Sequence, residues 1–162
     1  MSREWNDNYD GSEAEARLWE QALVNAMNSK RGQAFFRELE KELLAMKARG
    51  EGRLIAGCLI SDGNNKEVET VGCCTLGVLA CKKLRPEDIP LVTNRIMEDP
   101  YDFPSWLPSS MNIAPCLIAE IGTINDTQGF YYPQPETDEQ RFDRMLKWVQ
   151  DHISNNGEKV RR

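Results

Sequence analysis

The feature that most constrains this chain is a long apolar stripe with helical spacing in residues 30–48. Six apolar side chains recur there at three- and four-residue intervals, while most charged residues fall on the opposite face: the apolar set is Phe35, Phe36, Leu39, Leu43, Leu44 and Met46. This period predicts an amphipathic helix with one buried side. Gly50 and Gly52 follow, and glycine commonly ends helices in a left-handed conformation. We therefore expect a helix from about Lys30 to Ala48.

Two further amphipathic helices are predicted near the ends of the chain. Ser12 and Glu15 fit a capping box, and the residues that follow predict a buried stripe of Leu18, Trp19, Ala22, Leu23, Ala26 and Met27. Thr137 and Gln140 repeat the capping-box pattern. The helix after them should run from Asp138 to about Ile153, with a buried stripe of Phe142, Met145, Leu146, Val149 and Ile153.

The middle of the chain contains the only strand signals. Residues 54–60 form a short apolar run, residues 61–65 are rich in turn formers, and residues 66–72 should return as the second strand of a hairpin. Residues 73–84 could extend that strand or form a buried helix, and their Ala and Leu content favours the helix. A short helix is expected around Ile89–Ile96, and residues 98–108 should be irregular. Asn112 can cap a helix from Ile113 to about Asn125, with Pro115 in its first turn.

Length and composition limit the architecture to one domain. The 162 residues are 40% apolar and 28% charged, as in ordinary globular proteins. We predict an α+β fold, predominantly helical with five or six helices and a small antiparallel β-hairpin. Residues 1–11 should form a flexible polar arm, 12–154 a single globular domain and 155–162 a basic tail. The polar, acidic start excludes a secretory signal, and no apolar run is long enough to cross a membrane. We therefore expect a soluble, cytoplasmic protein with no membrane partner.

The charge balance is acidic and uneven. Twenty basic and 26 acidic residues give a net charge of −6, which makes binding to nucleic acid unfavourable overall. Residues 1–28 hold six acids and two bases, whereas residues 30–53 hold seven bases and four acids. Such a dipolar surface can steer a protein partner, although two solvated helix faces would give the same pattern. The oligomeric state is left open.

The five cysteines predict reduced thiols. Their number is odd, no Cys-x-x-Cys pair occurs, and the only histidine, His152, is far from them in the chain. These features disfavour a zinc site. Cys58, Cys73, Cys74, Cys81 and Cys116 all lie among apolar neighbours, so we expect them to pack in the core. We predict neither a metal nor a cofactor.

The sequence provides few residues for catalysis. A serine or cysteine nucleophile usually needs a histidine, and His152 lies near the end of a predicted helix, where a surface position is expected. No nucleophile elbow, P-loop or dinucleotide-binding glycine pattern is present. Glu120 and Asp126, six residues apart, are the alternative acidic site, because paired carboxylates can transfer protons or hold Mg²⁺. Acidic residues at a helix end more often face solvent or cap the helix.

Two aromatic loops are the candidate partner-binding site. Tyr101, Phe103 and Trp106 lie in a proline-broken segment, and Tyr131 and Tyr132 lie in a polar loop between two predicted helices. Loop aromatics either fill gaps in the core or anchor a partner, since Trp and Tyr are enriched among interface hot spots. The flanking residues of Tyr131 and Tyr132 offer little apolar sequence, so we expect at least one of these rings to be exposed.

Several segments resemble small uncharacterised proteins encoded by bacteriophages and prophages. The segments, in order, are Arg31–Leu39, Arg53–Gly57, Cys74–Ala80, Ile118–Ile121, Asn125-Asp126, Glu136–Phe142 and Trp148-Val149. They cover roughly residues 30–82 and 112–150. The resemblance implies a location in the cytoplasm of an infected or lysogenic bacterial host. It implies no catalytic residue, because those proteins carry no established activity.

Together these observations favour a phage-type, non-enzymatic binding protein that occupies or inhibits a host or defence protein, with nucleic-acid-handling complexes among the candidates. Two alternatives remain open. One is a small metal-dependent hydrolase or nuclease-like enzyme that uses Glu120 and Asp126. The other is a structural or DNA-contacting accessory protein that uses the basic face of residues 30–53.

Overall fold

Helix α2 (Lys30–Ala48) is the longest element and has the predicted bounds. Its first turn is capped by Ser29, whose hydroxyl accepts a hydrogen bond from the Gly32 amide at 2.9 Å. Its last turn is followed by Gly50 in the left-handed region, with φ 74°. Phe36, Leu39 and Leu43 are buried as predicted, whereas Leu44 is 44% exposed. Leu44, one of the six residues predicted for the buried stripe, is therefore not part of it.

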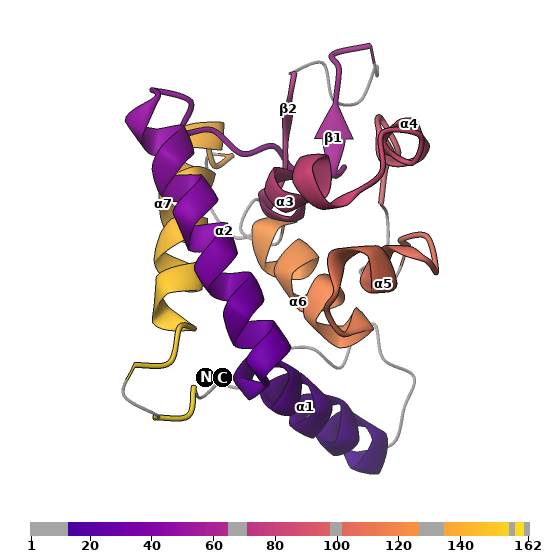
Figure 1. Ribbon diagram of the computed structural model, residues 1–162, viewed down its shortest axis with the longest axis vertical. Coiled ribbons are helices and arrows are strands. Elements are labelled where there is room, and N and C mark those ends of the chain that lie inside the picture. Colours follow the sequence, from indigo (N-terminus) through magenta and orange to yellow (C-terminus); the bar gives the residue numbers. More distant parts are fainter. Residues whose placement is uncertain (1–12, 65–70, 98–101, 127–134, 156–157, 161–162) are drawn as a thin grey trace.

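Helix α7 (Asp138–Asp151) lies beside α2 (Figure 1). The predicted capping box is present: the Thr137 hydroxyl accepts from the Gln140 amide at 3.1 Å, and the Gln140 side chain accepts from the Thr137 amide at 2.9 Å. Phe142, Met145, Leu146 and Val149 are all buried, which confirms four of the five residues of the stripe. The helix ends at Asp151, before the predicted end, and Ile153 is half-buried. Helices α2 and α7 therefore pair through the two faces that the sequence indicated.

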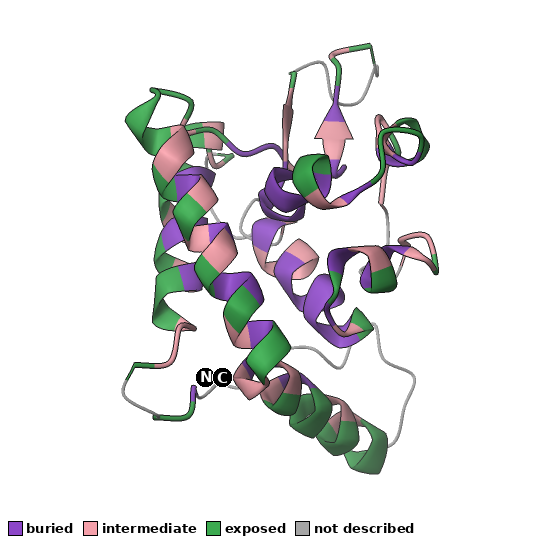
Figure 2. Ribbon diagram, in the orientation of Figure 1, coloured by how far each residue is buried: buried purple, intermediate pink, exposed green. Residues whose placement is uncertain are grey.

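Helix α1 (Glu13–Asn28) packs on α2 and α6 mainly through its C-terminal half. Leu23 and Met27 are buried, but Leu18 is 67% exposed and Ala22 is also exposed, so the predicted stripe is wrong at these positions. The reason is geometric: at 100° per residue Leu18 lies 180° and Ala22 140° from buried Met27, on the side of α1 away from the core. The first half of α1 also extends beyond the rest of the molecule, and its residues are mostly exposed (Figures 1 and 2). A helical period alone does not say how far the partner surface reaches.

Four shorter helices complete the core. Helix α3 (Thr75–Lys83) confirms the helical alternative for residues 73–84, and α6 (Pro115–Asp126) packs against it and against α1. Helices α4 (Ile89–Val92) and α5 (Leu107–Met111) are single turns, and the first two residues of α5 fall in the segment 98–108 that we predicted to be irregular. Asn112 does not cap α6. It ends α5 in the left-handed conformation, with φ 55° and ψ 41°.

Among the described residues the β-hairpin is shorter than predicted, and residues 65–70, which hold most of the predicted second strand, lie outside them. Strands β1 (Ile60–Ser61) and β2 (Gly72–Cys73) pair antiparallel, with Ile60 opposite Cys73 and Ser61 opposite Gly72. Gly57 breaks the apolar run before β1, because its φ of 82° is incompatible with an extended strand. Of the predicted strand 54–60, only its last residue belongs to β1.

The structure is a computed structural model, which describes residues 13–64, 71–97, 102–126, 135–155 and 158–160. Within these ranges seven helices and one two-stranded antiparallel sheet confirm the predicted helical α+β class. One apolar cluster joins all the longer helices, and its fully buried members include Phe36, Leu39, Leu59, Leu79, Leu117 and Phe142. No helix among the described residues is long and apolar enough to cross a bilayer.

Candidate functional site

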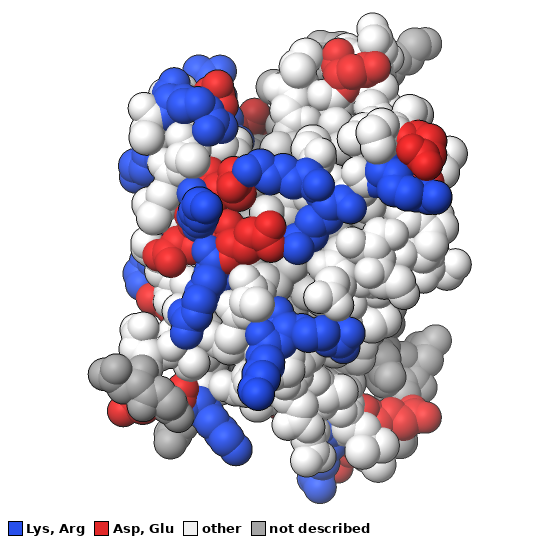
Figure 3. Space-filling view, viewed as in Figure 1, with Lys and Arg blue, Asp and Glu red and all other residues white. Residues whose placement is uncertain are grey.

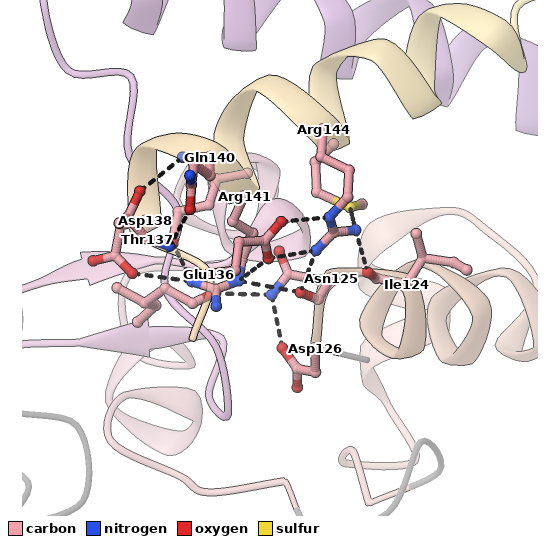
Figure 4. Close-up of polar contacts among 12 residues, drawn as sticks. Ile124, Asn125, Asp126, Glu136, Thr137, Asp138, Gln140, Arg141 and Arg144 are labelled. Carbon is pink, nitrogen blue, oxygen red and sulfur yellow. Dashed lines mark hydrogen bonds and ion pairs between the residues drawn. The ribbon is translucent and has the colours of Figure 1, made fainter. Parts of the chain in front are cut away.

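A network of polar side chains lies where α6 ends and α7 begins (Figure 4). Arg144 of α7 forms two hydrogen bonds with the Glu136 carboxylate, at 2.7 and 2.9 Å. The same guanidinium donates to the carbonyl oxygens of Ile124 at 2.6 Å and Asn125 at 3.1 Å. The last carbonyls of a helix have no partner within that helix. Arg144 therefore supplies donors to the C-terminal end of α6.

Arg141 is the most buried charged member of this network, with 7% of its surface exposed. Its guanidinium donates to the carbonyl oxygens of Leu54 at 2.9 Å and Asn125 at 3.2 Å. It is also bonded to Asp138 at 3.0 Å and lies 3.5 Å from the Glu136 carboxylate. A buried charge is tolerated only when it is paired and hydrogen-bonded, and Arg141 meets both conditions.

Asn125 joins α6 to the start of α3. Its side-chain oxygen accepts from the Thr75 amide at 3.1 Å and from the Thr75 hydroxyl at 2.7 Å. Its side-chain nitrogen donates to the carbonyl oxygen of Ile55 at 2.9 Å. Thr75 is the first residue of α3, and its amide needs a partner from outside the helix. Asn125, which is 1% exposed, therefore acts as a cap supplied by another helix.

The two carboxylates beside Asn125 and Arg144 have opposite pKa shifts. Burial raises the pKa of Asp126, against the opposing effect of hydrogen bonds from Asn125 and Gly57. The hydrogen bond from Arg144 lowers the pKa of Glu136. Acid–base sites use such pairs, but here both carboxylates already have protein partners. Asp126 accepts from the Gly57 amide at 3.3 Å and from Asn125 at 2.7 Å.

The predicted acidic pair does not form a site of the expected kind. Glu120 is fully buried, whereas Asp126 lies at the end of α6 within the network just described. Six residues of α-helix rise about 9 Å and turn about 240° beyond one full turn, so the two side chains point in different directions. Among the described residues, no group of three or more His, Cys, Asp or Glu side chains could hold a metal ion.

The predicted partner-binding aromatics are only partly within the described residues. Phe103 and Trp106 are half-buried and pack against the edge of the core. Tyr101, Tyr131 and Tyr132 lie outside the described residues. The expectation of an exposed ring at 131 or 132 therefore stays a prediction, and so does the role of all five rings in binding a partner.

The cysteines and the histidine differ in part from the prediction. All five thiols are free, and Cys58, Cys74 and Cys116 are buried, but Cys81 is exposed and is not a core residue. Burial raises the pKa of Cys73 to about 12. His152 is half-buried rather than on the surface. Its ring lies 4.2 Å from the Trp148 ring, and its Nδ1 is 2.7 Å from the Trp148 carbonyl oxygen.

Sequence reasoning missed the polar network, although one signal for Arg141 was present. At 100° per residue, Arg141 falls 40° from Met145 on the helical wheel, within the stripe predicted to be buried. A basic residue in such a stripe needs several acceptors nearby. No comparable signal identifies Asn125 or Arg144, because their partners come from other elements.

A hollow of about 240 Å³ lies where the end of α1, the start of α2 and the start of α6 meet. Its apolar lining comes from Ala26, Ile113, Ala114 and Leu117, and its polar lining includes Asn25, Ser29 and Arg31. This volume is below the roughly 300–1,000 Å³ that is typical of small-molecule sites. The hollow has room for a side chain of a larger partner.

No protein-family model, curated protein or solved structure matches this chain.

Proposed function

We propose that this chain is a phage-type, non-enzymatic binding protein that occupies or inhibits a host or defence protein. The proposed location is the cytoplasm of an infected or lysogenic bacterial host. The observation that carries the proposal is the outer face of α1, defined here as Ala14, Leu18, Ala22 and Asn25. All four residues are exposed on a helix whose first half extends beyond the rest of the molecule (Figure 2).

This outer face differs from an ordinary solvated helix surface in its apolar content. Leu18 is 67% exposed, with an exposed alanine four residues before it and another four residues after it. Single exposed leucines are common in soluble proteins. A projecting helix that presents a row of apolar side chains to solvent instead supports a role in binding another protein.

The geometry gives less support to the enzyme alternative. Glu120 is fully buried, and the Asp126 carboxylate already accepts hydrogen bonds from Gly57 and Asn125. The network around Asp126 connects α6, α7 and the segment before β1, which is a structural role. Proton transfer to a substrate would require Asp126 to leave these partners.

The DNA-contacting alternative is disfavoured by the charge pattern over α2. Lys47 pairs with Asp143 at 3.0 Å and Arg53 with Glu139 at 2.9 Å. Glu38 and Glu42 of α2 pair in turn with Lys83 and Lys82 of α3. Figure 3 shows acidic and basic side chains next to one another over the C-terminal half of α2. Phosphate binding favours basic residues without interleaved acids.

Reconstitution of a complex tests the proposal. The full chain is used to capture proteins from bacterial lysate, and each candidate is purified and mixed with the chain for sedimentation analysis. We expect a stoichiometric complex with one bacterial protein and loss of that protein's activity in the complex. If no purified candidate forms a complex, and the chain instead hydrolyses phosphoesters in a way that Asp126→Asn abolishes, the enzyme alternative replaces this proposal.

A further inference from the structure

We propose that the solvent face of α2 is a docking site for an acidic amphipathic helix of the partner protein. This face, which we call the basic stripe, consists of five exposed residues: Lys30, Ala34, Arg37, Lys41 and Leu44. The inference rests on the proposed function and adds a second contact surface with a stated partner chemistry. Three observations carry it: the alignment of the five residues, the open positive charge of three of them, and the apolar character of the other two.

The five residues lie on one line along α2. At 100° per residue, the other four fall within about 40° of Lys30 on the helical wheel, whereas the buried Leu39 lies at about 180°. The basic members are Lys30, Arg37 and Lys41, and they span about 17 Å at 1.5 Å per residue. The stripe therefore presents three positive charges to solvent in one row.

No described acidic side chain pairs with these three bases. Lys30 and Lys41 form no ion pair with any residue that the structure describes. Arg37 donates to the backbone carbonyl oxygen of Ser154 at 3.0 Å, a bond that leaves its charge uncompensated. On the side of the molecule that Figure 3 shows, basic side chains lie over the N-terminal half of α2, with no described acidic side chain among them.

The acidic residues of α2 lie beside the stripe and already have partners. Glu38 and Glu42 lie on one side of it and pair with two lysines of α3. Glu40 lies on the other side, where it accepts a hydrogen bond from a glutamine of α7. All three are about 80–120° from Lys30 on the helical wheel. The charge that is open to a partner along the stripe is therefore positive, although the whole chain carries a net charge of −6.

The spacing of the bases fits carboxylates on a second helix. Lys30, Arg37 and Lys41 are separated by seven and four residues, and positions with these separations on any α-helix also share one face at the same rise. A partner helix with glutamates at such positions can place one carboxylate beside each base. Complementary charges of this kind steer association and fix the register of the two surfaces.

The apolar members favour a protein helix over a nucleic acid. Ala34 lies between two of the bases, and its small side chain allows a second helix to approach closely, because the distance between packed helices depends on the side chains at the contact. Leu44, which is 44% exposed, offers an apolar contact at the other end. A phosphate backbone would instead meet the acidic residues on both sides of the stripe, which are unfavourable neighbours for it.

The probe for the test is a synthetic helical peptide of about 16 residues, with glutamates spaced by seven and four and with alanine and leucine on the same face. It is added to the isotopically labelled full chain, and amide chemical shifts are followed by NMR. We expect the largest shifts at residues 30–44. Affinity should fall about tenfold or more between about 0.05 M and about 0.5 M salt, because salt screens exposed charges.

A peptide with lysine in place of each glutamate is the charge control, and it should bind the wild type about tenfold or more weakly. Lys30→Glu and Lys41→Glu together reverse two charges of the stripe and should invert this preference, so that the lysine peptide binds more tightly. Both positions face solvent, and the spectra of this variant should show a folded protein.

Two single variants locate the charge that matters. Lys41→Gln removes one positive charge from the stripe and should weaken binding of the glutamate peptide about threefold. Arg95→Gln removes one positive charge from a side chain that is 42% exposed in the segment after α4, away from α2 (Figure 1), and should leave the affinity unchanged.

Several outcomes would overturn the docking proposal. These are no binding of the glutamate peptide, equal binding of the two peptides to the wild type, shifts confined to other surfaces, or an unchanged preference in the charge-reversed variant. A short double-stranded DNA that shifts residues 30–44 and binds more tightly than the glutamate peptide would assign the stripe to nucleic acid instead.

The same variant separates this site from the proposed function. If the reconstituted complex with a bacterial protein tolerates Lys30→Glu and Lys41→Glu together, the docking site is wrong although the proposed function stands. If no complex is reconstituted, the proposed function fails whatever the peptides show.

Discussion

At the scale of single residues, Asn125 and Arg141 carry contacts that connect distant parts of the chain. Asn125 joins residues 50 and 70 positions away, and Arg141 reaches back 87 positions to the Leu54 carbonyl. Both side chains are buried, and unpaired buried polar groups are costly. The complementary hydrogen bonds therefore fix the positions of α3, α6, α7 and the segment before β1 relative to one another.

The cysteines give a residue-scale prediction. Under native conditions a thiol-reactive dye should label one cysteine quickly, Cys81, because it is the exposed thiol. The other four should react slowly, since burial raises the pKa of Cys58, Cys73, Cys74 and Cys116 and lowers their thiolate fraction. Time-resolved thiol titration measures this, and Cys81→Ser should remove the fast phase. A fast phase of two or more thiols would contradict the assignment.

At the scale of whole elements, α2 and α7 were predictable because local sequence specifies most of each helix. Each has a capping residue, an apolar period and a clear end, and both have long partner surfaces. The first half of α1 has the same period, yet Leu18 is exposed. Whether a residue of a stripe is buried depends on which side of the helix the neighbouring elements cover and how far they extend, which the stripe itself does not encode. The polar network was also largely unpredictable, because the partners of Asn125 and Arg144 come from other elements of the fold.

The stripe of α2 supplies an element-scale prediction with an internal control. Leu39→Ala removes a fully buried side chain and should lower the free energy of unfolding by about 2–5 kcal/mol. Leu44→Ala removes the same atoms from a side chain that is 44% exposed, and should cost about 0.5 kcal/mol or less. Urea unfolding compares the two variants. Equal losses would mean that both leucines are buried to the same extent.

Two helical glycines make a second element-scale prediction. A Cβ atom at Gly77 would lie 2.0 Å from the Leu59 carbonyl oxygen, whereas at Gly122 the nearest atom would be 3.9 Å away. Gly77→Ala should therefore destabilise the protein by about 1–3 kcal/mol or more. Gly122→Ala should stabilise it by about 0.5–1 kcal/mol, because alanine favours helix. Thermal unfolding measures both, and a neutral Gly77→Ala would show that α3 can move away from Leu59.

At the scale of the whole molecule, the side chains of Gln33 in α2 and of Asn28, the last residue of α1, hold the C-terminal region against the body. Gln33 donates to the His152 carbonyl oxygen at 2.9 Å and accepts from the Ser154 amide at 2.8 Å. Asn28 forms two bonds with the backbone of Val160, which is buried although it lies in the segment predicted to be a basic tail. These hydrogen bonds join the C-terminal region to α1 and α2. The stability of the folded chain should also depend on pH, because Asp126 and Glu136 titrate within the polar network between α6 and α7.

The pH dependence of that stability is the whole-molecule prediction. The pKa of Asp126 is raised by burial, so the folded state holds this proton more tightly than the unfolded state. Its contribution to stability is fully present below the unfolded pKa and is lost as the pH rises through the folded pKa. The pKa of Glu136 is lowered, chiefly by Arg144, so its contribution is present above its unfolded pKa and is lost as the pH falls through the folded pKa.

Urea unfolding of the wild type, Asp126→Asn and Glu136→Gln from about pH 3 to pH 7 separates the two carboxylates. The stability of the wild type minus that of Asp126→Asn should fall as the pH rises, because ionising a buried carboxyl is unfavourable. The stability of the wild type minus that of Glu136→Gln should rise over the same change, since the ion pair with Arg144 forms. Slopes of the same sign would show either that burial does not raise the pKa of Asp126 or that Arg144 does not lower the pKa of Glu136.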